Sequence, residues 1–340
     1  MNEHELYMLR AIEIAQYGKG NVSPNPMVGC VIVYNNKIIG EGWHRKYGEG
    51  HAEVNAINSV QDKRLLPEST VYVTLEPCAH YGKTPPCADL LIEHSVKKVF
   101  IAVPDPNPLV LEKGIGKLKK AGIAVETGLL KELASEMNKR FLFSMTKKRP
   151  YVILKWAETN DGFLARENHD SKWISNQYSR MLVHTWRAEE DAILVGTNTA
   201  LYDDPRLNVR EVSGKNPVRI VIDRHLRLST DLNLFDGSER TICYNLKEDK
   251  VDGQNEWVQL TSDHFEKSLL EDLYTKGIRS IIIEGGKKTL DLFIQESLWN
   301  EARVFISQQT FGCGIKAPVL KAFCREENIH GDRLIYYKNS

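Results

Sequence analysis

The sequence predicts an α/β fold in two domains, and three observations support this prediction. The chain has 340 residues, which at roughly 100–200 residues per domain fits two domains or one large one. Short β-branched runs alternate with stretches of helical periodicity, as in layered α/β domains. A basic segment ending in proline, residues 146–150, lies between two such series. We therefore expect domains at 1–146 and 150–340, although a solvated loop within one domain would look the same.

The first series begins with a helix, because apolar residues from Leu6 to Ala15 recur at helical spacing. An apolar, β-branched run at 27–34 then predicts a strand, which closes at the turn signal Asn35-Asn36. The same two patterns continue along this half of the chain. Further strands are expected at 70–75, at 99–103 and from Val125, and further helices at 52–60, 88–94, 114–121 and 131–143.

The second series begins at Tyr151 with another apolar, β-branched run. Strand and helix patterns again alternate, which favours a second layered domain. Strands are expected at 192–195, 218–222, 241–244, 280–283 and 303–307, and helices at 177–189, 265–276 and 289–296.

The composition excludes several classes of protein. Lys+Arg and Asp+Glu each number 45, so the net charge of zero gives no broad footprint for nucleic acid or an anionic membrane. No apolar run approaches the roughly 20 residues that span a bilayer, and the acidic N-terminus is unlike a secretory signal. Six cysteines in so long a chain do not make a disulfide framework. We therefore expect a cytoplasmic protein.

A zinc site is predicted from three separated residues in the first half. His51 precedes an expected helix, Cys78 follows an expected strand, and Cys87 lies nine positions further on. Imidazole and thiolate are good zinc ligands, and three protein ligands leave a fourth position for water, as in catalytic sites. Glu53 could take the proton of that water and return it to the substrate. Residues i and i+2 of a helix do not share a face, so His51 must sit at the mouth of the helix.

The pattern resembles the zinc nucleobase-deaminase signature, H-x-E followed by P-C-x-x-C. The chain departs from it, because eight residues rather than two separate Cys78 from Cys87. The alternative is a closed structural zinc site with His80 as the fourth ligand. Such a site would have no use for Glu53.

Three longer segments resemble one family. They are Ser23–Gly29 (SPNPMVG), Gly40–Glu53 with its GEGWH and HAE motifs, and Thr74–Cys87 (TLEPCAHYGKTPPC). Together they resemble the deaminase half of the bifunctional deaminase/reductase family of riboflavin biosynthesis, in which the long Cys-to-Cys spacing is normal. Glu112 is a small departure, since that family more often has Gly there. The resemblance implies a cytidine-deaminase-like three-layer fold with one zinc ion.

The resemblance also implies the substrate, a diaminohydroxypyrimidine that carries a phosphoribosylamino group. A flat heterocycle with amide-like edges needs a partner that both donates and accepts, and Asn25 can do both. The phosphate of this substrate needs cationic partners, and the candidates are His44, His80 and Lys83. Alternatively, Asn25 is a turn residue between two prolines, His44 a surface histidine and Lys83 a solvated lysine.

A nucleotide site is predicted in the second half, although the Rossmann pattern G-x-G-x-x-G is absent. An expected strand at 280–283 is followed by Gly285, Gly286, Lys287 and a helix. Free N–H groups at a helix start bind phosphate, and glycine allows close approach. The same Gly-Gly pair is also common as a purely structural turn.

The family resemblance continues here, in the segments Lys155–Gly162, Ser171–Ser175, Arg187–Gly196 and Thr199–Arg210. It implies a dihydrofolate-reductase-like domain that uses NADPH. Gly312-Cys313-Gly314 departs from the adjacent glycines of the family. By motif position, the residues implied for the cofactor are Ala157, Trp173, Thr199, Asp203 and Gly286, and the turn before the helix adds Gly285 and Lys287. Those implied for the substrate are Lys155, Ser171, Arg187, Leu207, Arg210 and Glu284.

The sequence therefore predicts a bifunctional enzyme, a hydrolase and an oxidoreductase, that performs two consecutive steps of riboflavin synthesis. Deamination of the pyrimidine comes first, and NADPH-dependent reduction of the ribosyl group to ribityl follows. The main alternative is a zinc deaminase of tRNA or free nucleosides with an unrelated C-terminal domain; a second is a non-catalytic zinc protein. We expect small-molecule partners and a homo-oligomer. The cysteines without a ligand pattern are Cys30, Cys243, Cys313 and Cys324.

Overall fold

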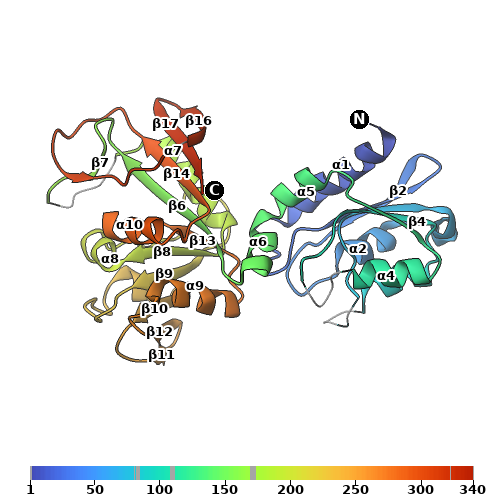
Figure 1. The fold of residues 1–340 in the computed structure, drawn as a ribbon, viewed down its shortest axis with the longest axis horizontal. Helices are drawn as coiled ribbons and strands as arrows, with labels where there is room; N and C mark the ends of the chain where they lie inside the picture. Colours follow the sequence, from blue (N-terminus) through green and yellow to red (C-terminus); the bar gives the residue numbers. More distant parts are fainter. Residues whose placement is uncertain are drawn as a thin grey trace. The chain divides into compact units, whose positions relative to one another are not determined.

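The computed structural model describes residues 2–79, 81, 85–107, 112–168, 174–321 and 323–339. The chain divides into two compact units, Met1–Lys148 and Arg149–Ser340, which Figure 1 colours from blue to green and from green to red. Within the described ranges, no helix is both long and apolar enough to cross a membrane.

The first unit is built on a five-stranded mixed sheet. Its strands are β1 (Gly29–Tyr34), β2 (Lys37–Trp43), β3 (Thr70–Leu75), β4 (Lys98–Val103) and β5 (Ala124–Thr127). They lie in the order β2-β1-β3-β4-β5, with β3, β4 and β5 parallel and β1 antiparallel to both neighbours. Asn35 and Asn36 join β1 to β2 and both have positive φ, as a type I′ hairpin turn requires.

Helices cover both faces of this sheet and make it three-layered. They are α1 (Glu3–Ala15), α2 (Ala52–Ser59), α3 (Cys87–Glu93), α4 (Lys113–Lys120), α5 (Lys131–Met137) and α6 (Lys139–Lys147). Alternate strand residues enter two separate cores, so that Cys30 and Ile32 pack with α2, α3 and α4. Val31 and Val33 pack instead with α1 and α5. Figure 1 shows α1 and α5 on one side of the sheet and α2 and α4 on the other.

The single helix expected at 131–143 is wrong, because the structure has two helices that meet at Asn138. The Asn138 side chain accepts a hydrogen bond from the N–H of Met27 and donates one to its carbonyl, at 2.9 and 2.7 Å. Asn138 is buried, and its φ and ψ of −102° and 17° leave the helical region. The break between the two helices thus lets Asn138 pair with the backbone N–H and C=O groups of Met27, just before β1. The second helix also runs into the expected linker, as far as Lys147.

The second unit is built on a ten-stranded sheet. Its strands are β6 (Tyr151–Glu158), β8 (Ala192–Gly196), β9 (Val218–Ile222), β10 (Thr241–Asn245), β11 (Lys250–Asp252), β12 (Asn255–Gln259), β13 (Ser280–Ile283), β14 (Glu301–Ile306), β16 (Phe323–Ile329) and β17 (Asp332–Lys338). Their order is β11-β12-β10-β9-β8-β13-β6-β14-β17-β16, and the seven strands from β12 to β14 are parallel. A separate ladder joins β7 (Phe163–Ala165) to β15 (Ile315–Lys316).

Helices also cover both faces of this larger sheet. They are α7 (Gln177–Glu189), α8 (Thr197–Asp203), α9 (Phe265–Thr275) and α10 (Lys287–Gln295). Phe265 and Leu290, from α9 and α10, belong to the main core of the unit. Ala200 of α8 lies in the core of the opposite face, and Trp186 of α7 stacks on Phe305 of β14. Because β6, β13, β8 and β9 are parallel, their carboxyl ends meet at one edge of the sheet. Open α/β sheets bind ligands at this edge.

Candidate active sites

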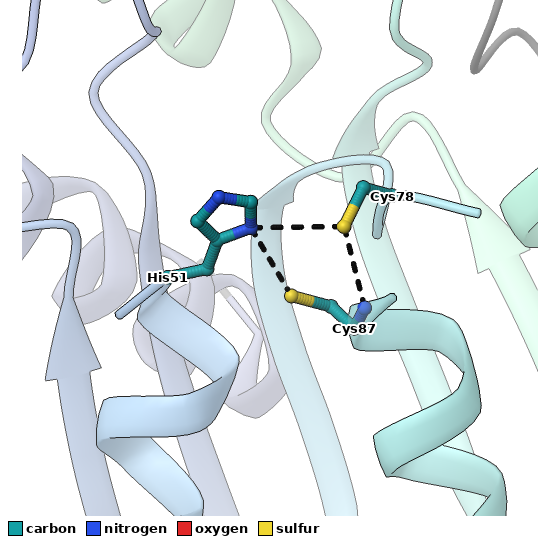
Figure 2. A group of neighbouring side chains, drawn as sticks. All are labelled: His51, Cys78 and Cys87. Atoms are coloured by element: carbon teal, nitrogen blue, oxygen red, sulfur yellow. Dashed lines mark hydrogen bonds between the residues drawn. The ribbon is translucent and has the colours of Figure 1, made fainter. Parts of the chain in front are cut away.

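Three side chains in the first unit converge on one point. One ligand atom from each of His51, Cys78 and Cys87 lies within 4.8 Å of the others. His51 Nδ1 is 3.6 Å from Cys78 Sγ and 3.3 Å from Cys87 Sγ, and Figure 2 shows both sulfurs turned toward this ring nitrogen. Among the residues that the structure describes, no other group of His, Cys, Asp or Glu has this arrangement.

Two helix starts and a strand end bring these residues together. His51 is the N-cap of α2, and its extended backbone (φ −69°, ψ 168°) places its ring beside the helix rather than on it. Cys87 is the first residue of α3. Cys78 follows β3 and is tied to α3, because its carbonyl and its sulfur accept hydrogen bonds from the N–H groups of Ala88 and Cys87, at 3.1 and 3.3 Å. The sequence expectation of a histidine at the helix mouth is confirmed.

The donor set of this cluster fits zinc. Hydrogen bonds from Cys87 and His51 strongly lower the pKa of the Cys78 thiol, which favours its thiolate form. The pKa of Cys87 is raised, chiefly because its thiol donates to Cys78. One imidazole and two cysteine sulfurs match the ligand chemistry of zinc and leave one tetrahedral position open.

Glu53 lies beside the cluster, on the first turn of α2. Its side chain is buried, and its pKa is raised, first by that burial and then by the negative charge of Cys78. The carboxylate also interacts with the Cys87 thiol. A carboxylate with a raised pKa is a stronger base than an ordinary one, which suits it to proton transfer.

Asn25 and His44 are hydrogen-bonded neighbours of this cluster. The amide nitrogen of Asn25 is 3.3 Å from His44 Nε2, and His44 Nδ1 is 3.2 Å from the carbonyl of Gly50. The His44 ring is buried against the His51 ring, 5.4 Å between centroids, and burial lowers its pKa. The expectation that His44 contacts the phosphate of the substrate stays a prediction. His80 and Lys83 lie outside the described residues.

The second unit contains a cavity of about 1010 Å³ at the carboxyl ends of its parallel strands. Of the residues expected to bind cofactor or substrate, Ser171 and Trp173 lie outside the described residues. The others all line this cavity: Lys155, Ala157, Arg187, Thr199, Asp203, Leu207, Arg210, Glu284, Gly285, Gly286 and Lys287. Residues far apart in the sequence, such as Lys155 and Lys287, thus share one concave site.

Three charged residues form an ion network in the wall of this cavity. Arg187 donates two hydrogen bonds to the Glu284 carboxylate, both at 2.9 Å, and Lys155 donates a third at 3.3 Å. Burial would raise the pKa of Glu284, but the charges of Arg187 and Lys155 outweigh it and lower that pKa to about 2. The network therefore carries one surplus positive charge. Arg187, expected as a phosphate contact, already has a carboxylate partner.

The glycine pair lies where two helices begin. Gly286 is the N-cap of α10, and its N–H donates to Thr199 Oγ1 in α8 at 2.9 Å. A Cβ atom on Gly285 would lie 2.8 Å from Thr289 Cβ, so no larger residue fits without movement. Lys287 forms an ion pair with Asp291 at 2.8 Å.

His184 lines the same cavity, and sequence reasoning assigned it no role. Its Nδ1 accepts a hydrogen bond from the N–H of Arg210 at 3.3 Å, which ties α7 to the loop that carries Arg210. Burial and the charges of Arg187 and Arg210 lower the pKa of His184 to about 4, so the ring is neutral at pH 7. The available signal was its position one helical turn before Arg187 in the expected helix, which puts both side chains on one face.

Two family models match this chain, one in each of its two units. Residues 1–103 match the cytidine and deoxycytidylate deaminase zinc-binding region, and residues 150–320 match the RibD C-terminal domain. The chain is 40% identical to riboflavin biosynthesis protein RibD of Aquifex aeolicus, over 95% of this chain and 92% of that protein. It is 42% identical to RibD of Bacillus amyloliquefaciens, over 93% and 87%.

Solved structures are similar over nearly the whole chain. One is a diaminohydroxyphosphoribosylaminopyrimidine deaminase/5-amino-6-(5-phosphoribosylamino)uracil reductase from Thermotoga maritima, with a TM-score of 0.90, 37% identity and 99% of each chain covered. Another is Acinetobacter baumannii RibD, with a TM-score of 0.90, 34% identity and 98% of each chain covered. The match of residues 150–320 contradicts the alternative of an unrelated C-terminal domain.

Proposed function

This chain belongs to the RibD family of bifunctional riboflavin-biosynthesis deaminase/reductases, and from that premise we propose how its residues divide the work. The cytidine-deaminase-like first unit removes an amino group from a phosphoribosylaminopyrimidine. The dihydrofolate-reductase-like second unit then reduces the ribosyl group of the product with NADPH. The observation that carries the proposal is the convergence of His51, Cys78 and Cys87 beside a buried Glu53.

In the first unit, His51, Cys78 and Cys87 would hold one zinc ion. Bound zinc lowers the pKa of a coordinated water toward neutrality. Glu53 accepts one proton of the attacking water on its carboxylate and delivers it to the ring nitrogen. It then takes the second proton of the same oxygen and delivers it to the departing amino group, which leaves as ammonia. Its raised pKa suits this exchange, because a carboxylate of low pKa would be too weak a base to take the proton of the water.

Asn25 is proposed to hold the pyrimidine ring. Its amide nitrogen is directed toward His44 Nε2, which leaves the amide oxygen to accept a hydrogen bond from an amino group of the substrate. His80 and Lys83 are proposed to contact the phosphate on the basis of the family resemblance alone.

In the second unit, we propose that the cavity holds NADPH and the deaminated product together. The nicotinamide supplies the hydride, and the protein supplies orientation and charge. Gly285, Gly286 and Lys287 are proposed for the cofactor phosphates, with Ala157, Thr199, Asp203 and Trp173 along the rest of the cofactor. Lys155, Arg187, Arg210, Leu207, Ser171 and Glu284 are proposed for the substrate, whose phosphate is attracted by the surplus positive charge of the Glu284 network.

Mass spectrometry of the products tests both steps. Incubation of the zinc-loaded protein with the phosphoribosylaminopyrimidine should give a product about one mass unit heavier, since =O replaces =NH in the balance of the reaction. Addition of NADPH should then add about two more, for one hydride and one proton. An unchanged substrate mass would contradict the deaminase assignment, and a product that stops after the first step would contradict the reductase assignment.

A further inference from the structure

We propose that Glu76 is a positioning residue that holds Cys78 in place for zinc. It does so through hydrogen bonds to backbone N–H groups that follow β4 and that begin α4. This inference rests on the proposed zinc role of Cys78. Glu76 follows the last residue of β3 and is separated from Cys78 only by Pro77. The side chain is buried, with the residue 4% exposed.

The Glu76 carboxylate accepts four hydrogen bonds, all from backbone N–H groups. Oε1 accepts from Gly114 and Ile115 at 3.1 and 3.2 Å, and Oε2 accepts from Asp105 and Glu112 at 3.3 and 3.1 Å. One carboxylate thus accepts hydrogen bonds from N–H groups that follow β4 and from N–H groups that begin α4. The N–H groups in the first turn of a helix have no partner within the helix.

Gly114 brings the same two segments into direct contact. A Cβ atom placed on Gly114 would lie 2.0 Å from the carbonyl oxygen of Pro77 and 3.3 Å from Glu76 Oε1. The first turn of α4 therefore packs on the backbone next to Cys78 with no room for a side chain. Any shift of α4 would be transmitted directly to the Pro77-Cys78 peptide.

Cys78 is fixed from two sides as a result. On one side, α3 holds it through the N–H groups of Cys87 and Ala88. On the other side, the Glu76 carboxylate and the Gly114 contact hold the residues that precede it. Glu76 differs in role from Glu53, because its hydrogen-bond partners are backbone groups and none is a ligand of the zinc cluster.

The carboxylate form of this side chain is what the four donors require. Glutamine at position 76 would present an amide NH₂ to at least one pair of N–H groups, which cannot hydrogen-bond to it. Outer-shell partners of metal ligands typically change metal affinity or activity by about 10–100-fold when replaced. The same range is expected here for zinc affinity.

Competition with a chromophoric chelator tests the inference on the full-length protein. Glu76→Gln should weaken zinc affinity about 10–100-fold, and Glu76→Asp should fall between this variant and the parent. Glu126→Gln is the matched control, because Glu126 lies in β5 of the same unit and pairs with Lys98 at the surface. We expect its zinc affinity to stay within about twofold of the parent.

If Glu76→Gln does not fold, Gly114→Ala tests in a second way whether the packing of α4 holds Cys78 in place. Its methyl group would press on the Pro77 carbonyl, so zinc affinity should fall while NADPH-dependent reduction of supplied intermediate is retained. A folded Glu76→Gln protein with lower thermal stability but parental zinc affinity would overturn the inference and leave Glu76 a purely structural residue. Failure of the parent protein itself to bind zinc would instead overturn the proposed function.

Discussion

Two buried carboxyl groups in this chain have pKa values shifted in opposite directions, and their neighbours explain the difference. Burial favours the neutral form of both. Glu53 lies beside the Cys78 thiolate, which raises its pKa further. Glu284 lies between two cations, which lower its pKa to about 2. The first group is suited to moving a proton and the second to holding a fixed charge.

Replacement of Glu53 by glutamine tests the proton-transfer role. The amide keeps the shape of the side chain but cannot accept and return a proton, so deamination should fall by about 10²–10⁴-fold. Zinc content and NADPH-dependent reduction should remain at the parental level. Product analysis with metal determination on one sample measures all three, and unimpaired deamination would remove Glu53 from the mechanism.

Replacement of Glu284 by glutamine tests the ion network through its pH dependence. The variant leaves Arg187 and Lys155 without their carboxylate, which should cost about 3–5 kcal/mol of stability near pH 7. Because the folded pKa lies below the usual value of 4.5, this contribution is present above pH 4.5 and is lost as the pH falls toward 2. Denaturant unfolding of parent and variant should therefore differ most at neutral pH. A difference that stays constant down to pH 3 would contradict this account.

Some site residues could be predicted from the sequence and others could not. His51, Glu53, Cys78 and Cys87 are residue types suited to a catalytic zinc site, and the family resemblance accounts for the long spacing between the two cysteines, so their convergence could be foreseen. Glu76 could not, because its partners are backbone N–H groups up to 39 positions away, and backbone groups leave no pattern in a sequence.

At the scale of helices and strands, continuous apolar runs were the elements that the sequence predicted most readily. The buried strands β3, β4, β8 and β13 are apolar runs, and all four were expected. β2 was missed because it is half exposed and contains Gly40 and Gly42. A Cβ atom on Gly42 would lie 2.2 Å from the N atom of Ala56, so these glycines are required by close packing of α2. β11 and β16 were missed because they are exposed edge strands with polar residues.

The start of α4 offers a test of backbone strain. Glu112 is its N-cap and has φ 57° and ψ 0°, a left-handed conformation that costs a non-glycine residue about 1–2 kcal/mol. Glu112→Gly should relieve this strain and stabilise the first unit by up to about 1 kcal/mol, the gain being reduced by the greater freedom of glycine in the unfolded chain. Glu112→Ala should not stabilise it, since alanine retains the Cβ atom. Thermal unfolding of the two variants side by side would reveal the contrast, and equal effects would argue against strain.

At the scale of the whole molecule, each unit has its own sheet and its own cores. The cores of the first unit draw on residues 7–142, and those of the second on residues from Val152 onward. The zinc cluster belongs to the first unit and the large cavity to the second. We therefore expect deamination to depend on zinc alone and reduction to depend on NADPH alone.

Removal of zinc tests this independence. A strong chelator should abolish deamination, because His51, Cys78 and Cys87 would lose the ion that they hold. Reduction of the deaminated intermediate, supplied directly and followed by loss of NADPH absorbance, should continue at the parental rate. Readdition of zinc should restore the first activity, and a parallel loss of both activities would show that the units depend on one another.

The strand order of the second unit also determines when it can fold as the ribosome makes it. β6 is made first, but its neighbours in the sheet are β13 and β14, which are among the later strands to be synthesised. The first unit has all its strands once Thr127 has been added. Domains generally fold as units, the N-terminal one first. A translation product that stops before Ser280 would thus have a finished deaminase followed by a reductase sheet with its centre missing.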